Sequence, residues 1–378
     1  MKDPLRIIQV VNVRWFNATA WYGLSLSRLL QDAGHRVRVL GLPGTDSFAR
    51  AESMGLDVLP MNLNTVNPFR LPFLLHAIRT QLREFKPHLV NCHRGESVLL
   101  WGLCKSGERP FALIRTRGDQ RPPKGNLPNR LLHTRLVDAL IATNSRTAAQ
   151  CRERLGIGPD RLFMIPGGVN TARFAPDPEG RAEVRRRYGF ADEDMVVGLL
   201  GRLDPVKGPR ELIKAVQRAR ASFSERRGRI KLLFIGFPVS LSLETVQGWI
   251  EEAGLSGDAV ITGKVDDVAA HINAMDMGVI ASQWSEAIAR AAFEIMACGV
   301  PLVGTDIGVM PDILSGEALA PVGDAGAPAA LIERGFCDAA FLPALREQQG
   351  LRMQTFSNRC FLEATLEVYR SVLKPGAM

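Results

Sequence analysis

Residues 196–208 read VVGLLGRLDPVKG, a short apolar run that ends in a loop rich in glycine and charge. The run has the length and the Val and Leu content of a strand buried on both faces, and a helical stretch follows the loop. Arg202 and Lys207 lie at this junction, where two cations and a helix N-terminus together favour a diphosphate. A plain turn with surface charges is the alternative. The stretch lacks the spacing of a dinucleotide fingerprint or of a Walker A loop.

The same alternation of apolar runs and helical stretches continues on both sides of this junction. In the first half the runs are RIIQVVNV, RVRVLGL, LVNCH, FALIRT and ALIATN, and in the second half they are VVGLLGRL, KLLFIGF, AVITGKV, MGVIAS and PLVGTD. Such alternation predicts parallel sheets covered by helices, with ligands at the carboxyl ends of the strands. We therefore expect an α/β protein with two Rossmann-like, doubly wound domains that face a cleft.

Length and composition place the domain boundaries. A chain of 378 residues with 46% hydrophobic content is long enough for two cores. Residues 167–194 are rich in Gly, Pro and charge, which predicts a linker between a first domain over 1–178 and a second over 195–354. An apolar stripe along the last segment predicts a helix within 355–378 that crosses back to the first domain.

Charge differs between the two halves. Residues 1–178 hold 25 Lys and Arg against 13 Asp and Glu, and the remaining 200 residues hold 22 against 26. A basic half suits nucleic acid, an anionic membrane face or an anionic substrate, but no helix-turn-helix, RNA-binding or zinc-finger signature accompanies it, so nucleic acid is not expected. The six cysteines show no CxxC spacing, and no run approaches about 20 apolar residues, which favours a cytoplasmic protein without membrane spans.

Residues 285–304 read SEAIARAAFEIMACGVPLVG and contain two carboxylates in an apolar setting. Their composition predicts a helix with Glu286 at its N-terminus and Glu294 about 12 Å further along. A carboxylate among apolar neighbours needs a partner. The partner of Glu294 is either Arg290, at i, i+4 spacing, or the ribose hydroxyls of a sugar nucleotide.

Three motifs in this order resemble the donor-binding domain of retaining GT-B glycosyltransferases of family 4. They are PGGVNTARF at 166–174, GRLDPVKG at 201–208, and the Glu-x7-Glu of EAIARAAFE followed by MACGVPLVGTDIGVMPDIL. In the first half, RTRGD and ATNSRTAAQ are similar to segments of enzymes that build lipopolysaccharide core or other surface glycans. The resemblance implies a GT-B fold and sugar transfer with retention at the anomeric carbon.

The resemblance also implies roles for the residues of the second half. Arg202, Lys207 and Glu286 would be catalytic, with the two cations on the departing diphosphate and Glu286 on the transferred sugar. Glu294 would hold the ribose. Further contacts to the nucleotide sugar are expected from Gly201, Gly236, Val265, Ala287, Ile288 and Ala289. A UDP-sugar is the favoured donor, with GDP- and ADP-sugars as alternatives.

No obligatory metal or other cofactor is expected, because Arg202 and Lys207 supply the charge that a cation otherwise would. The DED sequence at 192–194 matches the DxD metal signature of the other glycosyltransferase fold. It precedes an expected strand inside the charged linker, which favours a solvated loop.

The acceptor side is expected in the first half, near the strand ends that carry Asn17, His93, Arg117 and Asp119. His93 either faces the cleft or caps the next helix. Gly118 stands where many members of the family have a histidine, and this departure leaves room for a protein that binds without transferring.

The loop RWFNATAWYG replaces the Gly-Gly loop that family members commonly carry after the first strand. Its bulky residues Trp15, Phe16 and Trp21 either shape an acceptor pocket or pack under the loop.

These observations together predict a hexosyltransferase-type enzyme. Its partners would be a nucleotide sugar and an anionic glycan or glycolipid, in lipopolysaccharide or surface polysaccharide synthesis at the inner face of the cytoplasmic membrane. The alternatives are a catalytically silent sugar-nucleotide binder, a GT-B sugar-nucleotide epimerase and a phosphorylase. A nicotinamide dehydrogenase is disfavoured by the missing glycine fingerprint.

Overall fold

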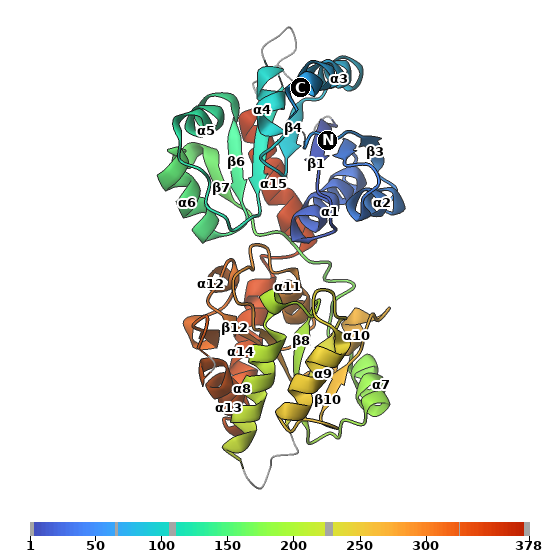
Figure 1. The fold of residues 1–378 in the computed structure, drawn as a ribbon, viewed down its shortest axis with the longest axis vertical. Helices are drawn as coiled ribbons and strands as arrows, with labels where there is room; N and C mark the ends of the chain where they lie inside the picture. The colour runs from blue at the N-terminus through green and yellow to red at the C-terminus, as the bar shows by residue number, and fades with distance from the viewer. Residues whose placement is uncertain (1–3, 65–66, 106–110, 224–229, 325, 374–378) are drawn as a thin grey trace. The chain divides into compact units, whose positions relative to one another are not determined.

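A computed structural model describes residues 4–64, 67–105, 111–223, 230–324 and 326–373 (Figure 1). The chain divides into two compact units, one formed by Met1–Gly167 with Asn358–Met378 and the other by Gly168–Ser357. Each unit contains one parallel sheet with helices packed around it. The prediction of two doubly wound α/β domains is confirmed.

The first unit has a seven-stranded sheet with the order β3-β2-β1-β4-β5-β6-β7. The strands are β1 (Arg6–Val11), β2 (Arg36–Gly41), β3 (Asp57–Pro60), β4 (Leu89–Cys92), β5 (Ala112–Arg117), β6 (Ala139–Ala142) and β7 (Leu162–Met164). Every residue of β4 and β6 is buried, as expected for central strands that are covered on both faces.

The first unit has seven α-helices within the described residues, and side chains cap the N-termini of several of them. They are α1 (Ala18–Asp32), α2 (Asp46–Ser53), α3 (Leu71–Phe85), α4 (Val98–Leu103), α5 (Leu127–Leu131), α6 (Ser145–Leu155) and α15 (Asn358–Val372). Asn17, Thr45 and Asn144 accept hydrogen bonds from backbone N–H groups in the first turns of α1, α2 and α6. Each of these caps follows a strand end, so it fixes the direction in which the chain turns back over the sheet.

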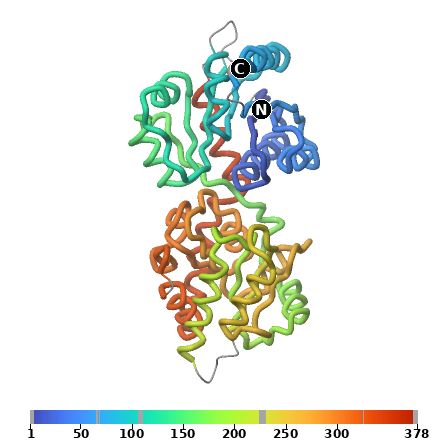
Figure 2. The backbone as a smooth tube through the Cα atoms, viewed as in Figure 1, coloured from blue at the N-terminus to red at the C-terminus, as the bar shows by residue number. Residues whose placement is uncertain are grey.

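Helix α15 is the C-terminal helix, drawn in red within the N-terminal unit (Figure 2). Its Tyr369 hydroxyl accepts hydrogen bonds from the side chains of Gln9 and Asn91 at 3.0 and 2.9 Å. Its Phe361 packs edge-on against Tyr22. These contacts hold α15 to β1, β4 and α1. Residues 374–378 of the expected C-terminal segment lie outside the described residues.

The second unit has a six-stranded sheet with the order β10-β9-β8-β11-β12-β13. The strands are β8 (Met195–Leu200), β9 (Ile230–Ile235), β10 (Ala259–Ile261), β11 (Met277–Ile280), β12 (Leu302–Thr305) and β13 (Leu319–Ala320). The helices are α7 (Pro178–Tyr188), α8 (Pro209–Ala221), α9 (Leu243–Glu252), α10 (Val268–Asn273), α11 (Arg290–Ala297), α12 (Met310–Ile313), α13 (Gly326–Cys337) and α14 (Phe341–Met353).

The segment expected to be a linker, 167–194, contains helix α7, and the division between the units follows Gly167, at the start of that segment. Two arginines of α7 explain why a charged segment folds onto the second unit. Arg181 and Arg185 donate to the two carboxylate oxygens of Asp276 at 2.6 and 3.0 Å. No helix within the described residues is long and apolar enough to cross a membrane.

Candidate functional site

Two glycines bring the ends of β8 and β9 together. Gly201 and Gly236 follow these strands with φ angles of 147° and 152°, and a Cβ on Gly236 would lie only 1.9 Å from the carbonyl oxygen of Gly201. Only glycine permits this approach. The main chain of both residues therefore lies at the carboxyl edge of the sheet, where ligands bind in folds of this class.

A third glycine holds the loop after β8 against the loop after β11. Gly208 has a φ of 68°, and a Cβ there would lie 2.0 Å from the carbonyl oxygen of Ala281. The backbone N–H of Gln283 also donates to the carbonyl of Val206 at 2.9 Å. As a result, Lys207 is brought to the loop that carries Glu286.

Glu286 lies in that loop, four residues before α11 begins at Arg290. The helix therefore starts later than predicted, and Glu286 is not at its N-terminus. The buried carboxylate forms an ion pair with Lys207 and accepts a hydrogen bond from Ser282 Oγ at 2.5 Å. Residues about 80 positions apart in the sequence thus meet in one neutral, hydrogen-bonded group.

Ala287, Ile288 and Ala289 are buried and connect this group to α11. Ala289 has a φ of 47°, in the left-handed region that favours glycine. Strain of this kind clusters at functional sites because the surrounding structure must enforce it. The turn directs the first turn of α11, the positive end of its helix dipole, to the same edge of the sheet as Lys207.

Glu294 lies inside α11, and its side chain is 7% exposed. Burial raises the pKa of its carboxyl, against the opposing effects of Arg290 and Arg173. Arg290 Nε donates to Glu294 Oε1 at 2.6 Å, so the ion pair considered from the sequence is present. The pair uses one carboxylate oxygen and does not by itself exclude a ligand on the other.

Arg202 also has a carboxylate partner, which the sequence reasoning did not identify. Its Nη2 lies 3.2 Å from Oδ2 of Asp204, a residue within the same GRLDPVKG loop. Asp204 is buried and accepts hydrogen bonds from the backbone and the hydroxyl of Ser240 at 3.1 and 2.7 Å. A diphosphate at this loop would therefore compete with carboxylates for both Arg202 and Lys207.

The other residues considered in the second unit, Val265 and the DED sequence at 192–194, have structural contacts. Val265 is partly buried, and its side chain packs against the hydrophobic core. In the DED sequence, Asp194 Oδ2 accepts from the backbone of Ala191 at 2.8 Å and closes the turn between α7 and β8. Within the described residues, no group of three or more His, Cys, Asp or Glu side chains is arranged to hold a metal ion.

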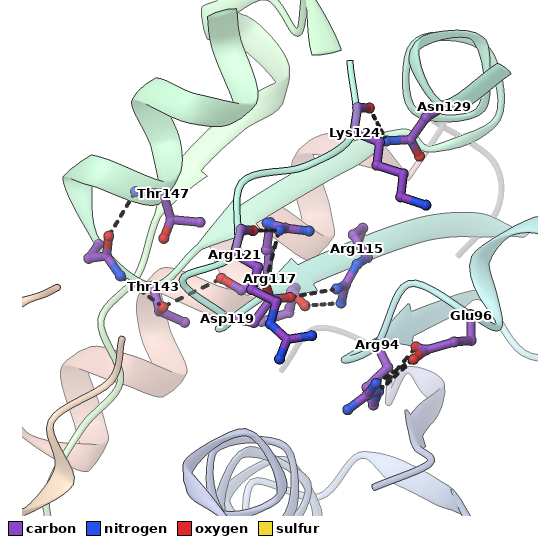
Figure 3. Close-up of polar contacts among 12 residues, drawn as sticks. Arg94, Glu96, Arg115, Arg117, Asp119, Arg121, Lys124, Asn129, Thr143 and Thr147 are labelled. Carbon is purple, nitrogen blue, oxygen red and sulfur yellow. Dashed lines mark hydrogen bonds and ion pairs between the residues drawn. The ribbon is translucent and has the colours of Figure 1, made fainter. Parts of the chain in front are cut away.

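In the first unit, the structure brings Arg117 and Asp119 together at the carboxyl end of β5 (Figure 3). Arg117 Nη2 lies 2.9 Å from Asp119 Oδ1, and Arg115 Nη2 lies 3.9 Å from Asp119 Oδ2. Two guanidinium groups thus share one carboxylate, whose side chain is half exposed. The nearby Arg94 forms its own ion pair with Glu96 (Figure 3).

Arg115 and Arg117 are unusually desolvated for cations. The Arg115 side chain is 2% exposed and donates to the carbonyl of Cys92 at 2.9 Å. Burial and the neighbouring Arg117 lower the pKa of Arg115 to about 10. The Arg117 Nε is buried and has no hydrogen-bond partner among the described residues. Two desolvated cations that share a single carboxylate leave an excess of positive charge, so this cluster favours an incoming anion.

The other two acceptor-side candidates have clear structural contacts. His93 is buried, and its Nε2 lies 2.8 Å from Gln9 Oε1. Burial, with a smaller effect of Arg115, lowers the pKa of His93 to about 3, so the imidazole is neutral at physiological pH. Asn17 Oδ1 accepts from the backbone of Ala20 at 3.1 Å and caps α1.

The three bulky residues after β1 separate into different environments. Phe16 packs against the hydrophobic cluster beneath the loop. The Trp21 ring lies beside Gly167. Trp15 is 65% exposed. Phe16 therefore packs under the loop, whereas the exposed Trp15 is accessible to a ligand.

Two family models match the chain in succession. The model described as Glycosyltransferase Family 4 matches residues 20–173, and the model described as Glycosyl transferases group 1 matches residues 180–350. All but the last six residues of the first match lie in the unit that holds Arg117 and Asp119, and the second match covers both the GRLDPVKG loop and α11.

Curated relatives match part of the chain. A D-inositol 3-phosphate glycosyltransferase from Geodermatophilus obscurus is 30% identical over 196 residues, which are 50% of this chain and 43% of that protein. A protein of the same description from Kineococcus radiotolerans is 26% identical over 276 residues, which are 69% of this chain and 63% of that protein. The chain thus spans less than two thirds of the length of these relatives.

Solved structures match almost the whole chain. A glycosyltransferase from Rickettsia africae has a TM-score of 0.87 at 18% identity, covering 99% of this chain and 100% of that one. HepE from Anabaena, solved in complex with UDP and glucose, has a TM-score of 0.79 at 16% identity, covering 97% and 100%. The apo form of WaaB, a lipopolysaccharide outer core galactosyltransferase, has a TM-score of 0.73 at 15% identity, covering 97% and 99%.

At these identities the likeness establishes the fold, and it confirms the predicted GT-B architecture. The two family models together take in most of the sequence in the order expected of such a protein. The chain is therefore similar in sequence to glycosyltransferases of family 4 over residues 20–173 and of group 1 over residues 180–350, and it has the GT-B fold.

Proposed function

We propose that the chain is a retaining glycosyltransferase that moves a sugar from a nucleotide sugar, with a UDP-sugar as the favoured donor. The observation that carries the proposal is the ion pair between Lys207 and Glu286 next to the first turn of α11. It brings a cation for a diphosphate, a carboxylate for a sugar hydroxyl and a helix N-terminus to one edge of the sheet.

On this proposal the donor rearranges the existing ion pairs. The diphosphate takes Arg202 and Lys207 from their carboxylates, and Glu286 then accepts a hydrogen bond from a hydroxyl of the transferred sugar. Glu294 accepts from the ribose hydroxyls while it retains Arg290. Because the cations are already positioned, they stabilise the charge that develops on the departing nucleotide without reorganising at the moment of reaction.

The transfer step needs no separate base in the proposed front-face reaction. The bond between the anomeric carbon and the phosphate oxygen breaks as a bond from that carbon to the acceptor oxygen forms on the same face. The departing phosphate oxygen takes the acceptor proton. Holding the two reactants in this orientation is a large part of the rate acceleration, so Gly118 in place of a histidine does not prevent it.

The proposed acceptor is an anionic glycan or glycolipid of lipopolysaccharide or another surface polysaccharide. Two observations support an anionic group: the excess of 25 basic over 13 acidic residues in 1–178, and the desolvated pair Arg115 and Arg117 with one shared carboxylate. The charge also suits the inner face of the cytoplasmic membrane, where a lipid-linked acceptor would be presented.

A catalytically silent sugar-nucleotide binder is the second candidate. The observation in its favour is Gly118, which stands on the acceptor side where many members of the family have a histidine. A sugar-nucleotide epimerase of the same fold would use the same donor site. Neither candidate would add a sugar to an acceptor.

Thermal unfolding with UDP, GDP, ADP and their sugar derivatives tests the donor site. A ligand at 100 times its dissociation constant adds about 2.7 kcal/mol to the free energy of unfolding, which is readily measured as a rise in Tm. We expect the largest rise with uridine nucleotides. No rise with any nucleotide would contradict both the transferase and the binder, and donor turnover without consumption of an acceptor would favour the epimerase.

A further inference from the structure

A polar cavity of about 480 Å3 lies in the first unit, at the carboxyl ends of β1, β2 and β3. Its volume is within the range of small-molecule sites. The polar and aromatic residues that line it are Arg14, Trp15, Thr45, Asp46, Asn62 and Asn64. None of the residues proposed for the donor or for the anionic group of the acceptor lies among them, so the cavity needs an explanation of its own.

The buried Asn12 connects the segment after β1 with the end of β2 and the loop after β3. Asn12 Nδ2 donates to the carbonyl of Leu40 at 3.2 Å, and its Oδ1 accepts from the backbone of Leu63 at 2.8 Å. Its carbonyl accepts from Asn64 Nδ2 at 2.9 Å, and Asn62 Oδ1 accepts from the backbone of Asn64 at 3.1 Å. These bonds fix the two lining amides, so the cavity is preorganised rather than a gap between mobile loops.

The aromatic residue of the cavity is the exposed Trp15. Its indole is 65% exposed, whereas its neighbour Phe16 packs beneath the loop. A ligand that covers the exposed indole would remove its apolar surface from water, and this burial would contribute favourably to the free energy of binding.

The chemistry of the lining selects the class of ligand. A sugar ring presents C–H groups on one face, which pack on an indole, and hydroxyl groups at its edge, which both donate and accept. The Asp46 carboxylate accepts, the Arg14 guanidinium donates, and the Asn62 and Asn64 amides do both. One positive and one negative side chain leave the cavity without net charge, in contrast to the Arg115–Arg117 cluster, so a neutral ligand fits better than a phosphate.

We propose that this cavity holds a neutral sugar residue of the acceptor, separate from the residue that receives the new sugar. The inference rests on the proposed glycosyltransferase function and extends it. It implies an acceptor with at least one sugar besides the hydroxyl-bearing unit, and it makes Trp15 a residue that determines acceptor specificity.

The test is binding of the full chain to an array of neutral mono-, di- and trisaccharides and their phosphorylated forms, followed by calorimetric titration of the saccharides that bind. We expect neutral saccharides to bind, with affinity about 10-fold weaker in Trp15→Ala because an aromatic stacking partner is lost. Trp15→Phe keeps a ring and should lose less. The control is Phe73→Ala, which removes a 77% exposed aromatic ring that lies outside the cavity.

Two results would overturn the inference. One is that the unaltered chain binds no neutral saccharide, and the other is that Trp15→Ala binds saccharides as tightly as Phe73→Ala. A parallel titration with UDP separates this failure from failure of the proposed function. Saccharide binding that depends on Trp15 in a chain that neither binds UDP nor turns over a UDP-sugar would support the cavity and contradict the transferase.

Discussion

The two units of this protein hold their functional cations in opposite ways, one with paired charges and one with an unbalanced cluster. In the second unit, Lys207 and Arg202 each contact a carboxylate, Glu286 and Asp204 respectively. Both carboxylates are buried and hold further hydrogen bonds from serines. The pairs keep the loop neutral and its side chains oriented, and in the proposed function a diphosphate replaces the carboxylates.

In the first unit, Arg115 and Arg117 share the half-exposed Asp119, and burial lowers the pKa of Arg115. Positive charge is therefore left without a matched partner. The difference is consistent with the proposal that the chain binds two anionic ligands. On the proposed function, a donor that leaves after each reaction suits a site that re-forms its own ion pairs. The excess positive charge of Arg115 and Arg117 would instead attract the proposed anionic acceptor.

The largest effect is expected where the paired cation is removed. Lys207→Ala should lower turnover of the UDP-sugar by about 100-fold to 1000-fold, as loss of a preorganised charge stabiliser typically does. It also leaves Glu286 buried without its cation. The measurement is steady-state release of UDP, with Lys214→Ala, an exposed lysine on the neighbouring α8, as the control. If Lys207→Ala turned over the UDP-sugar at nearly the rate of the control, Lys207 would have no role in the reaction.

The fold was largely predictable from the sequence, because its signals are local. Runs such as VVGLLGRL have the composition of buried parallel strands, and the loop from Gly201 to Gly208 carries glycines where the main chain adopts positive φ. Glu286 and Glu294 could be singled out because carboxylates are rare in apolar segments, and Arg202 and Lys207 because they lie where a strand gives way to a helix.

The pairing within the site could not be predicted, because it depends on where the chain turns in space. Asp204 is visible in GRLDPVKG, but Ser240, which donates to it, comes from the loop after β9. Because Ala289 adopts a left-handed conformation, α11 begins only at Arg290. An alanine in the sequence gives no local signal for that conformation. Helix α7 was missed because its charge suggested solvent, whereas Asp276 provides a tertiary partner.

A second test concerns the desolvated region of the first unit. The folded-state pKa of His93 is lowered to about 3 from 6.5, chiefly by burial, so the unfolded chain takes up the proton first as pH falls. The resulting stability is present above pH 6.5 and is lost as pH falls towards 3. Between pH 7 and pH 5 the loss is about 2 kcal/mol, since one pKa unit corresponds to about 1.36 kcal/mol.

Urea unfolding of the unaltered chain and of His93→Gln at both pH values measures this loss. The Gln variant should lose less stability on acidification. The exposed His76 provides the control through His76→Gln, which should follow the unaltered chain. If the His93 and His76 variants show the same dependence on pH, the histidine is not held neutral by burial, and the contrast between the two units weakens.

A third test asks whether the pair of Arg290 and Glu294 also serves a ligand. Glu294→Gln keeps the shape of the side chain but removes the charge, so nucleoside diphosphate binding should weaken about 10-fold, within the range for a hydrogen bond to a charged group. Calorimetric titration with UDP is the measurement. Arg290→Met breaks the ion pair and leaves the carboxylate. Unchanged affinity in Glu294→Gln would make the ion pair the whole role of this residue.

The smallest effect is expected from the exposed charge of the first unit. Binding to anionic liposomes should fall as salt rises, because the attraction between surface charges is screened with a Debye length of about 8 Å at physiological ionic strength. Co-sedimentation with anionic and neutral vesicles across a salt series measures it. Equal binding to both kinds of vesicle at every salt concentration would mean that the basic excess does not recruit a membrane.

The most direct test of the central claim is transfer itself. Purified protein is incubated with the UDP-sugar that binds most tightly and with an extract of candidate glycolipids, and products are analysed by mass spectrometry. The unaltered chain should yield a product heavier by one sugar, and Lys207→Ala should yield far less. Transfer only after Gly118→His, with none by the unaltered chain, would contradict the account and identify the protein as a silent binder.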